Sequence, residues 1–265
     1  MSVRPAFDRA RAEGRAALVG YLPAGFPDVD GGIDALRAMV ESGCDVIEVG
    51  LPYSDPVMDG PTIQEAAQQA LDRGVRTADV LRTVEAVAAT GTPTVVMTYW
   101  NPVDRYGVER FARDLAAAGG SGLITPDLTP DADPQWAEAA DALDLDKIFL
   151  VAPSSTDARI EMTTAACRGF VYATAVMGVT GAREDTSDLA EPLVARTRKA
   201  TDLPVAVGVG VGNGRQAASV AAYADGVIVG SAFVRTLLDH PDDRAAGLAA
   251  LAALTADLAE GVRGA

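Results

Sequence analysis

The chain has 265 residues with an apolar fraction of 49% and an aromatic fraction of 5%, so its core would be built mainly from Ala, Val, Leu and Ile. A net charge of −15 argues against nucleic acid or anionic membrane as partner. Two cysteines without C-x-x-C spacing and one histidine supply no zinc or iron ligand set, so no metal is predicted. The N-terminus has no signal-peptide pattern and no apolar run reaches 18 residues, so we expect no membrane span and a cytoplasmic location.

Short β-branched runs alternate with Ala-rich amphipathic stretches along the chain. The predicted strands are residues 17–21, 45–49, 94–97, 122–125, 147–151, 169–173, 205–208 and 226–229. The predicted helices are residues 33–41, 62–72, 77–89, 108–118, 134–142, 157–166, 188–200, 214–222 and 243 to about 262. Strands that alternate with helices indicate a parallel sheet.

Eight such strands predict an α/β fold, a single (β/α)8 TIM barrel over residues 1–265 with extra N-terminal and loop helices. A doubly wound open sheet is the alternative. The loops that follow the strands hold most of the Pro, Gly and Asp, whereas the loops that enter them are short and plain. Because barrel active sites lie at the C-terminal ends of the strands, this asymmetry favours the barrel and predicts a site in those loops.

Glu48 interrupts the apolar run D-V-I-E-V-G, residues 45–50. Side chains alternate along a strand, so placing Ile47 and Val49 against the helices turns Glu48 into the barrel near its C-terminal mouth. Apolar neighbours would raise its pKa and suit it to proton transfer near neutral pH. The alternative is a glutamate held by a buried hydrogen bond or ion pair.

Three aspartates lie in nearby loops with less specific signals. Asp55 precedes Pro56 and fits a turn or capping role. Asp59 precedes Gly-Pro and a helix, so the residues leave open both chemistry and turn shaping. The sequence leaves the role of Asp127, in T-P-D-L-T-P, open in the same way.

The three last loops after strands predict a phosphate site. They contain G-V-T-G, V-G-V-G-N-G and V-G-S, and the last two open helices. Helix N-termini offer free N–H groups and the positive end of the helix dipole. These segments contain no Lys or Arg, so backbone N–H groups with Thr180 and Ser231 would hold the anion.

The stretch E-V-G-L-P-Y-S-D-P-V-M-D-G-P-T-I-Q, residues 48–64, resembles the signature of the tryptophan synthase alpha subunit family. The resemblance continues through Y-L-P-A-G-F-P-D, M-T-Y-W-N-P, F-V-Y-A-T-A-V-M-G-V-T-G-A-R and V-G-S-A over nearly the whole chain. It implies a (β/α)8 barrel that cleaves indole-3-glycerol phosphate to indole and glyceraldehyde 3-phosphate. It also implies an α2β2 complex, with no cofactor in this chain and pyridoxal phosphate (PLP) in the beta subunit.

By this resemblance Glu48 and Asp59 match the catalytic acids. The other matched positions are Tyr21 and Met97 around the indole, Asp55 in the loop that meets the beta subunit, Tyr172 beside the catalytic glutamate, Thr180 and Gly181 in the loop after strand 6, and Gly210, Gly230 and Ser231 around the phosphate. The departures from the family pattern are Pro23, Thr129, Val176 and Val209.

The rival functions are another phosphate-binding barrel isomerase, a stand-alone indole-3-glycerol-phosphate lyase, and a subunit kept mainly to activate a beta partner. The first would share the glycine-rich loops but lack the spacing of the 48–64 stretch. The last is disfavoured because both acids and the phosphate loops are present.

Overall fold

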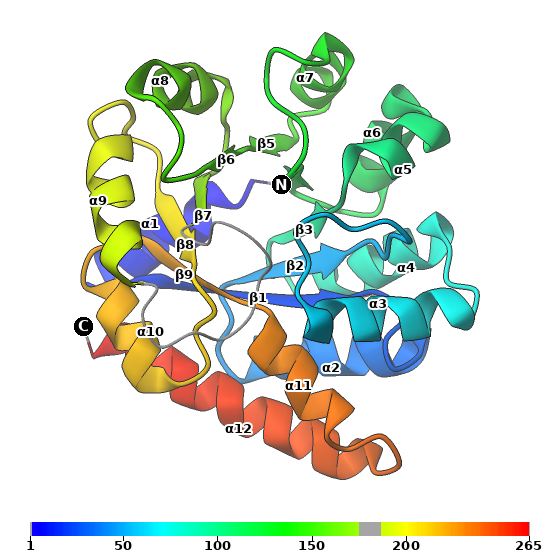
Figure 1. Ribbon diagram of the computed structural model, residues 1–265. Helices are drawn as coiled ribbons and strands as arrows, with labels where there is room; N and C mark the ends of the chain where they lie inside the picture. The colour runs from blue at the N-terminus through cyan, green and yellow to red at the C-terminus, as the bar shows by residue number, and fades with distance from the viewer. Residues whose placement is uncertain (1, 175–186, 265) are drawn as a thin grey trace.

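Parallel strands form the centre of the molecule, and helices surround them (Figure 1). The computed structural model describes residues 2–174 and 187–264. The strands in this part of the chain are β1 (Ala17–Pro23), β2 (Val46–Gly50), β3 (Thr94–Met97), β4 (Gly122–Ile124), β5 (Asp146–Ile148), β6 (Leu150–Val151), β7 (Val171–Thr174), β8 (Val205–Gly208) and β9 (Gly226–Val229). Their order in the sheet is β5-β4-β3-β2-β1-β9-β8-β7-β6.

The two ends of that order are joined by the chain itself. β5 pairs with β4, β6 pairs with β7, and only Phe149 separates β5 from β6. The segment 146–151 therefore closes the sheet into a barrel, which confirms the predicted fold class and excludes the open sheet. The predicted fifth strand, 147–151, is divided in two by Phe149, whereas the third, seventh and eighth strands have the predicted bounds.

All nine predicted helices are present, and three more are added within the described residues. The helices are α1 (Arg4–Ala12), α2 (Val29–Glu41), α3 (Pro61–Asp72), α4 (Thr77–Ala88), α5 (Trp100–Tyr106), α6 (Val108–Ala117), α7 (Pro134–Ala142), α8 (Asp157–Ala166), α9 (Ser187–Thr197), α10 (Gly214–Ala221), α11 (Ser231–Leu238) and α12 (Arg244–Arg263). The predicted 33–41 helix begins earlier, at Val29, because Asp28 caps it by accepting a hydrogen bond from the Gly31 N–H at 2.7 Å.

Alternation along the strands divides the core into two layers. Val46, Val95 and Ile124 belong to the cluster inside the barrel. Ile47 and Val49 belong to the larger cluster between the strands and the helices. The inward direction predicted for the face that carries Glu48 therefore agrees with the packing of its strand neighbours.

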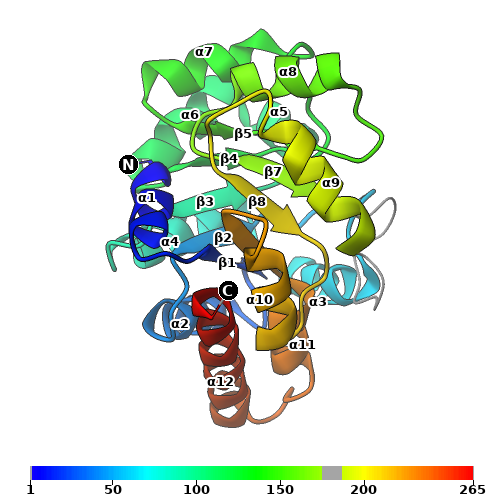
Figure 2. The same cartoon turned by 90° about the vertical axis from the view of Figure 1, so that its left-hand side faces the viewer.

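Helix α1 lies at the N-terminal end of the barrel, opposite the ends toward which the strand arrows point (Figure 2). Its Phe7 joins the inner cluster, and the Phe7 and Phe170 ring centroids lie 5.2 Å apart. The bottom of the barrel is thus filled by α1. The loops after the strands lie at the other end, where the site was expected.

Helix α12 is the one helix among the described residues that is long and apolar enough to cross a membrane by length and composition. It packs against α2, α10 and α11, and its buried face includes Leu251, Leu258 and Val262. This packing gives α12 a place in the outer helical layer of the barrel.

Candidate active site

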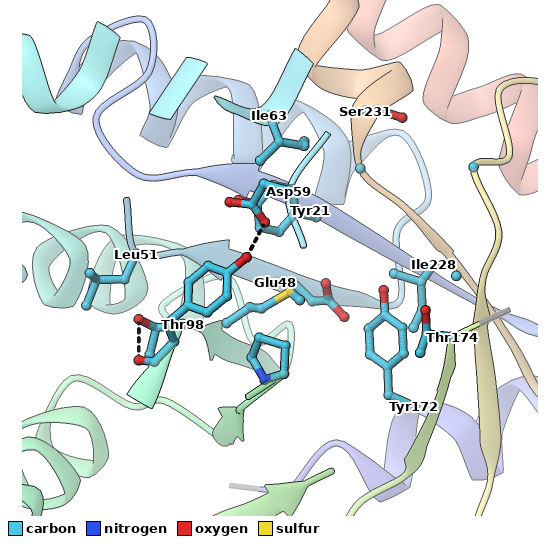
Figure 3. Close-up of a pocket in the computed structure, with 16 residues that line it drawn as sticks. Tyr21, Glu48, Leu51, Asp59, Ile63, Thr98, Tyr172, Thr174, Ile228 and Ser231 are labelled. Atoms are coloured by element: carbon cyan, nitrogen blue, oxygen red, sulfur yellow. Dashed lines mark hydrogen bonds between the residues drawn. The ribbon is translucent and has the colours of Figure 1, made fainter. Parts of the chain in front are cut away.

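A pocket opens at the C-terminal mouth of the barrel (Figure 3). It is lined by Tyr21, Glu48, Leu51, Asp59, Ile63, Met97, Thr98, Tyr99, Pro126, Tyr172, Thr174, Gly208, Gly210, Ile228, Gly230 and Ser231. The predicted catalytic acids and all predicted substrate contacts within the described residues are in this set. Thr180 and Gly181, and the departure Val176, lie outside the described residues.

Glu48 is buried in β2, with 1% of its surface exposed. Its Oε1 has no hydrogen-bond partner among the described residues, so the alternative of a glutamate tied down in the core finds no support there. Burial away from water disfavours the charged form and raises the pKa of Glu48 to about 8. Figure 3 shows its carboxyl group pointing toward the Tyr172 hydroxyl across the pocket.

Two glycines provide the space for the tyrosines on either side of Glu48. A Cβ at Gly50 would lie 2.3 Å from the Tyr21 hydroxyl oxygen, and one at Gly208 would lie 2.6 Å from that of Tyr172. Strand pairing sets Tyr21 beside Glu48. Desolvation raises the pKa of both phenols, and the Glu48 carboxyl raises it further.

Asp59 enters the pocket from the loop between β2 and α3. The Tyr99 hydroxyl donates a hydrogen bond to Asp59 Oδ1 at 3.2 Å, and the Gln64 side-chain amide donates to the Asp59 carbonyl at 2.8 Å. Burial raises the pKa of Asp59, and the Tyr99 hydrogen bond opposes that rise. The two acids therefore lie in different surroundings, because Asp59 Oδ1 accepts a hydrogen bond, whereas Glu48 Oε1 has no donor within residues 2–174 and 187–264.

The N-termini of α10 and α11 differ in their capacity for an anion. In α10, Asn213 accepts from the Gln216 N–H, Asp257 accepts from the Gly214 N–H, and the Gln216 side chain accepts from the Gly212 N–H. Helix α11 follows Gly230 with no side-chain cap, and Ser231 lines the pocket. Of these two N-termini, the first turn of α11 therefore has the greater capacity for an anion, and Gly210, with its φ of +75°, lines the same pocket.

The other two loop aspartates lie away from the pocket. Asp55 is exposed and accepts a hydrogen bond from the Ser54 hydroxyl at 2.5 Å. Asp127 accepts from the Trp100 N–H at 2.9 Å and so caps the start of α5. Asp127 therefore has a structural role as the cap of α5.

The described departures from the family pattern also lie outside the pocket lining. Pro23 ends β1, and Val209 is 5% exposed and packs in the outer core. Thr129 is exposed in the loop after β4. Their side chains do not alter the lining described here.

Tyr99 is the pocket residue with a clear polar role that the sequence predictions missed. It follows β3 in the quoted segment M-T-Y-W-N-P, so its place after a strand was the available signal. Its partner Asp59 lies 40 residues away, and no local pattern joins the two. Leu51, Ile63 and Ile228 were also missed, because apolar residues near strand ends are common in any barrel.

Chemically, the pocket combines a carboxyl group that titrates near neutral pH, a second carboxyl with a hydrogen-bond donor, apolar walls and an uncapped helix N-terminus. Such a site can bind a flat apolar ring and a phosphate, and its carboxyl groups can give protons to the bound molecule and take protons from it.

Comparisons with known proteins agree with this geometry. A family model described as "Tryptophan synthase alpha chain" matches residues 7–263. The tryptophan synthase alpha chain of Salinispora arenicola is 67% identical over 258 residues, 97% of this chain and 96% of that one. A structure of Mycobacterium tuberculosis tryptophan synthase superposes with a TM-score of 0.93 at 59% identity and covers 98% of both chains. Since the match spans the barrel and every loop that forms the pocket, the chain belongs to the tryptophan synthase alpha chain family.

Proposed function

We propose that this chain cleaves indole-3-glycerol phosphate to indole and D-glyceraldehyde 3-phosphate with Glu48 and Asp59 as its two catalytic acids. The reaction is a retro-aldol cleavage. The observation that carries the assignment is the buried Glu48 carboxyl at the pocket, whose Oε1 has no partner among the described residues and whose pKa is raised to about 8.

Each acid has a separate role in the proposed mechanism. Indole C3 gains a proton, the C3′ hydroxyl loses one, and the carbon–carbon bond between the ring and the side chain breaks to leave an aldehyde. Glu48 delivers and accepts these protons, since its pKa is close to neutral pH. Asp59 holds the ring N–H and stabilises the positive charge that develops on the ring, for which it has to be ionised.

The remaining pocket residues bind the substrate. Tyr21 and Met97 contact the indole ring, and Tyr172 lies beside Glu48. Backbone N–H groups at Gly210 and Gly230, with the Ser231 hydroxyl, hold the phosphate. Thr180 and Gly181, which lie outside the described residues, are assigned to the substrate site by the family resemblance. The support for the phosphate position is the uncapped start of α11.

The indole passes to a tryptophan synthase beta subunit for L-tryptophan synthesis, in the α2β2 heterotetramer of the family. The beta subunit carries PLP, and this chain needs no cofactor or metal for its own step. Asp55 and the neighbouring Val57, which is 73% exposed, are the proposed contacts in the loop that meets this partner. The enzyme is a soluble biosynthetic protein, and its location is cytoplasmic.

The test of the catalytic assignment is Glu48→Gln, which keeps the shape of the side chain and removes its titratable proton. Turnover should fall at least about 100-fold while substrate binding changes little, because general acid–base groups contribute roughly 10²–10⁴-fold. Indole release from indole-3-glycerol phosphate is measured with the purified chain, with and without a beta subunit.

The same assay separates the rival functions. An isomerase would consume its substrate without releasing indole, and a stand-alone lyase would be equally active without a beta subunit. Glu109→Gln, an exposed acid on α6, is the control and should retain full activity. Near-normal turnover of Glu48→Gln would refute the role given to Glu48.

A further inference from the structure

Tyr99 holds the loop that carries Asp59 against the barrel. It is 5% exposed, lies between the end of β3 and the start of α5, and packs against Tyr53 with ring centroids 5.4 Å apart and the rings tilted by 37°. Its hydroxyl oxygen accepts a hydrogen bond from the Met58 N–H at 2.9 Å. The same hydroxyl donates to Asp59 Oδ1 at 3.2 Å, the contact drawn as the dashed line at Asp59 in Figure 3.

These two contacts fix the direction of the hydroxyl proton. A phenol has one O–H donor, and the Met58 N–H occupies an acceptor position on the oxygen. The proton is thereby turned toward Asp59. A hydrogen bond donated to a carboxylate is stronger than one donated to a neutral carboxyl group, so it favours the ionised form.

The surroundings of Asp59 make this donor important. The titratable side chains that line the pocket with Asp59 are Tyr21, Glu48, Tyr99 and Tyr172, and the lining contains no Lys, Arg or His among the described residues. Without a cation, a half-buried carboxylate depends on hydrogen bonds to remain ionised. The Tyr99 hydroxyl supplies such a hydrogen bond to Asp59 Oδ1, and a carboxylate has a second oxygen that can accept one from a ligand.

We propose that Tyr99 is a positioning residue that keeps Asp59 ionised and directs its second carboxylate oxygen toward the ring N–H of the substrate. This inference rests on the proposed function and deepens it, because it assigns the source of the difference between the two acids. Burial alone would raise the pKa of Asp59, as it does for Glu48, and the Tyr99 hydrogen bond opposes that effect.

The experiment compares Tyr99→Phe with Tyr106→Phe. Tyr99→Phe retains the ring and its packing against Tyr53 but removes the hydroxyl. Tyr106→Phe removes a similar hydrogen bond, from the Tyr106 hydroxyl to Asp114 Oδ2 at 2.6 Å, on α5 and outside the pocket lining. The pH dependence of kcat/KM for indole release is measured for each variant beside the unchanged chain.

Tyr99→Phe should lower kcat/KM about 10-fold or more and move its acidic limb to higher pH, because a smaller fraction of Asp59 is ionised. Tyr106→Phe should leave both unchanged. In the Asp59→Asn background, Tyr99→Phe should change the residual turnover by less than about twofold, since the hydroxyl acts through Asp59. An equal loss in that background, or an unmoved acidic limb, would overturn the proposal.

A second readout does not need activity. The Asp59 carboxyl carbon is followed by NMR through a pH titration, and its pKa should be higher in Tyr99→Phe than in the unchanged chain. An identical titration in both would reject the role of Tyr99. If the unchanged chain released no indole while this pKa difference was present, the proposed function would fail and the Tyr99–Asp59 coupling would stand.

Discussion

At the scale of single residues, the two proposed catalytic acids differ through their neighbours. Glu48 is surrounded by barrel strands, and its Oε1 has no partner in the part of the chain that the structure describes, so desolvation dominates its pKa. Asp59 is less buried and accepts the Tyr99 hydrogen bond. When their environments push the pKa values of two carboxyl groups apart, one site can contain a proton donor and a fixed negative charge at the same pH.

The raised pKa of Glu48 also predicts how stability depends on pH. Between its ordinary value of 4.5 and about 8, the folded protein keeps a proton that the unfolded chain releases. Glu48 therefore stabilises the fold fully below about pH 4.5, and this contribution is lost as the pH rises through 8. At roughly 1.4 kcal/mol per pH unit, the loss is at most about 5 kcal/mol.

We expect Glu48→Gln, which does not titrate, to gain stability relative to the unchanged chain as the pH rises from 5 to 9. The free energy of unfolding in urea is measured for both at pH 5, 7 and 9. The Tyr21 and Tyr172 phenols, whose pKa Glu48 affects, stay protonated up to pH 9 in both proteins, and the contributions of the remaining groups cancel in the difference. A difference that stays constant across this range would contradict a pKa raised by burial.

At the scale of elements, α5 is a helix that the sequence around it does not predict. It has only seven residues, its preceding residue Tyr99 provides no side-chain cap, and its start is instead capped by Asp127 from the loop after β4. Both Asp127 oxygens lie within 3.1 Å of the Trp100 N–H. A cap supplied from 27 residues away cannot be read from the sequence around the helix.

Asp127→Ala should lower the free energy of unfolding by about 1 kcal/mol, since it removes the cap of α5. Asp127→Asn retains an acceptor oxygen and should lower the free energy of unfolding by only a few tenths of about 1 kcal/mol. Asp202→Ala, at an exposed loop aspartate, is the control and should be nearly neutral. Urea unfolding measures all three, and indole release tests the alternative role. A loss of turnover beyond about 10-fold in Asp127→Asn would show that Asp127 takes part in the chemistry.

At the scale of the whole molecule, the barrel follows from the sequence because its signals are periodic and repeated. Apolar runs such as those at β3, β8 and β9 gave the correct bounds, since each is β-branched and ends at glycine or a polar residue. The inward direction of Glu48 followed from the two-residue period of β2. The break at Phe149 and the Tyr99–Asp59 contact depend on closure of the barrel, which brings distant residues together without leaving a local pattern.

Closure also depends on the N-terminal segment, which is attached to the seam of the barrel. Asp146, the first residue of β5, is fully buried. It accepts hydrogen bonds from the Val3 N–H at 2.8 Å and the Ser2 hydroxyl at 2.9 Å, and Arg168 Nε lies 3.5 Å from its other oxygen. The residue that begins the closing strand thus holds the start of α1 under the barrel.

Asp146→Ala should therefore destabilise the whole fold by about 3 kcal/mol, because it leaves the Val3 N–H buried without its acceptor and loosens α1. Asp8→Ala is the matched control on α1. It removes an exposed ion pair with Arg4 and should cost about 0.5 kcal/mol or less. Urea unfolding measures both losses, and hydrogen exchange follows the amides of α1 and β5. If Asp146→Ala cost no more than Asp8→Ala, the closing strand would hold without the N-terminal segment, and the packing of Phe7 on Phe170 would be sufficient to retain α1.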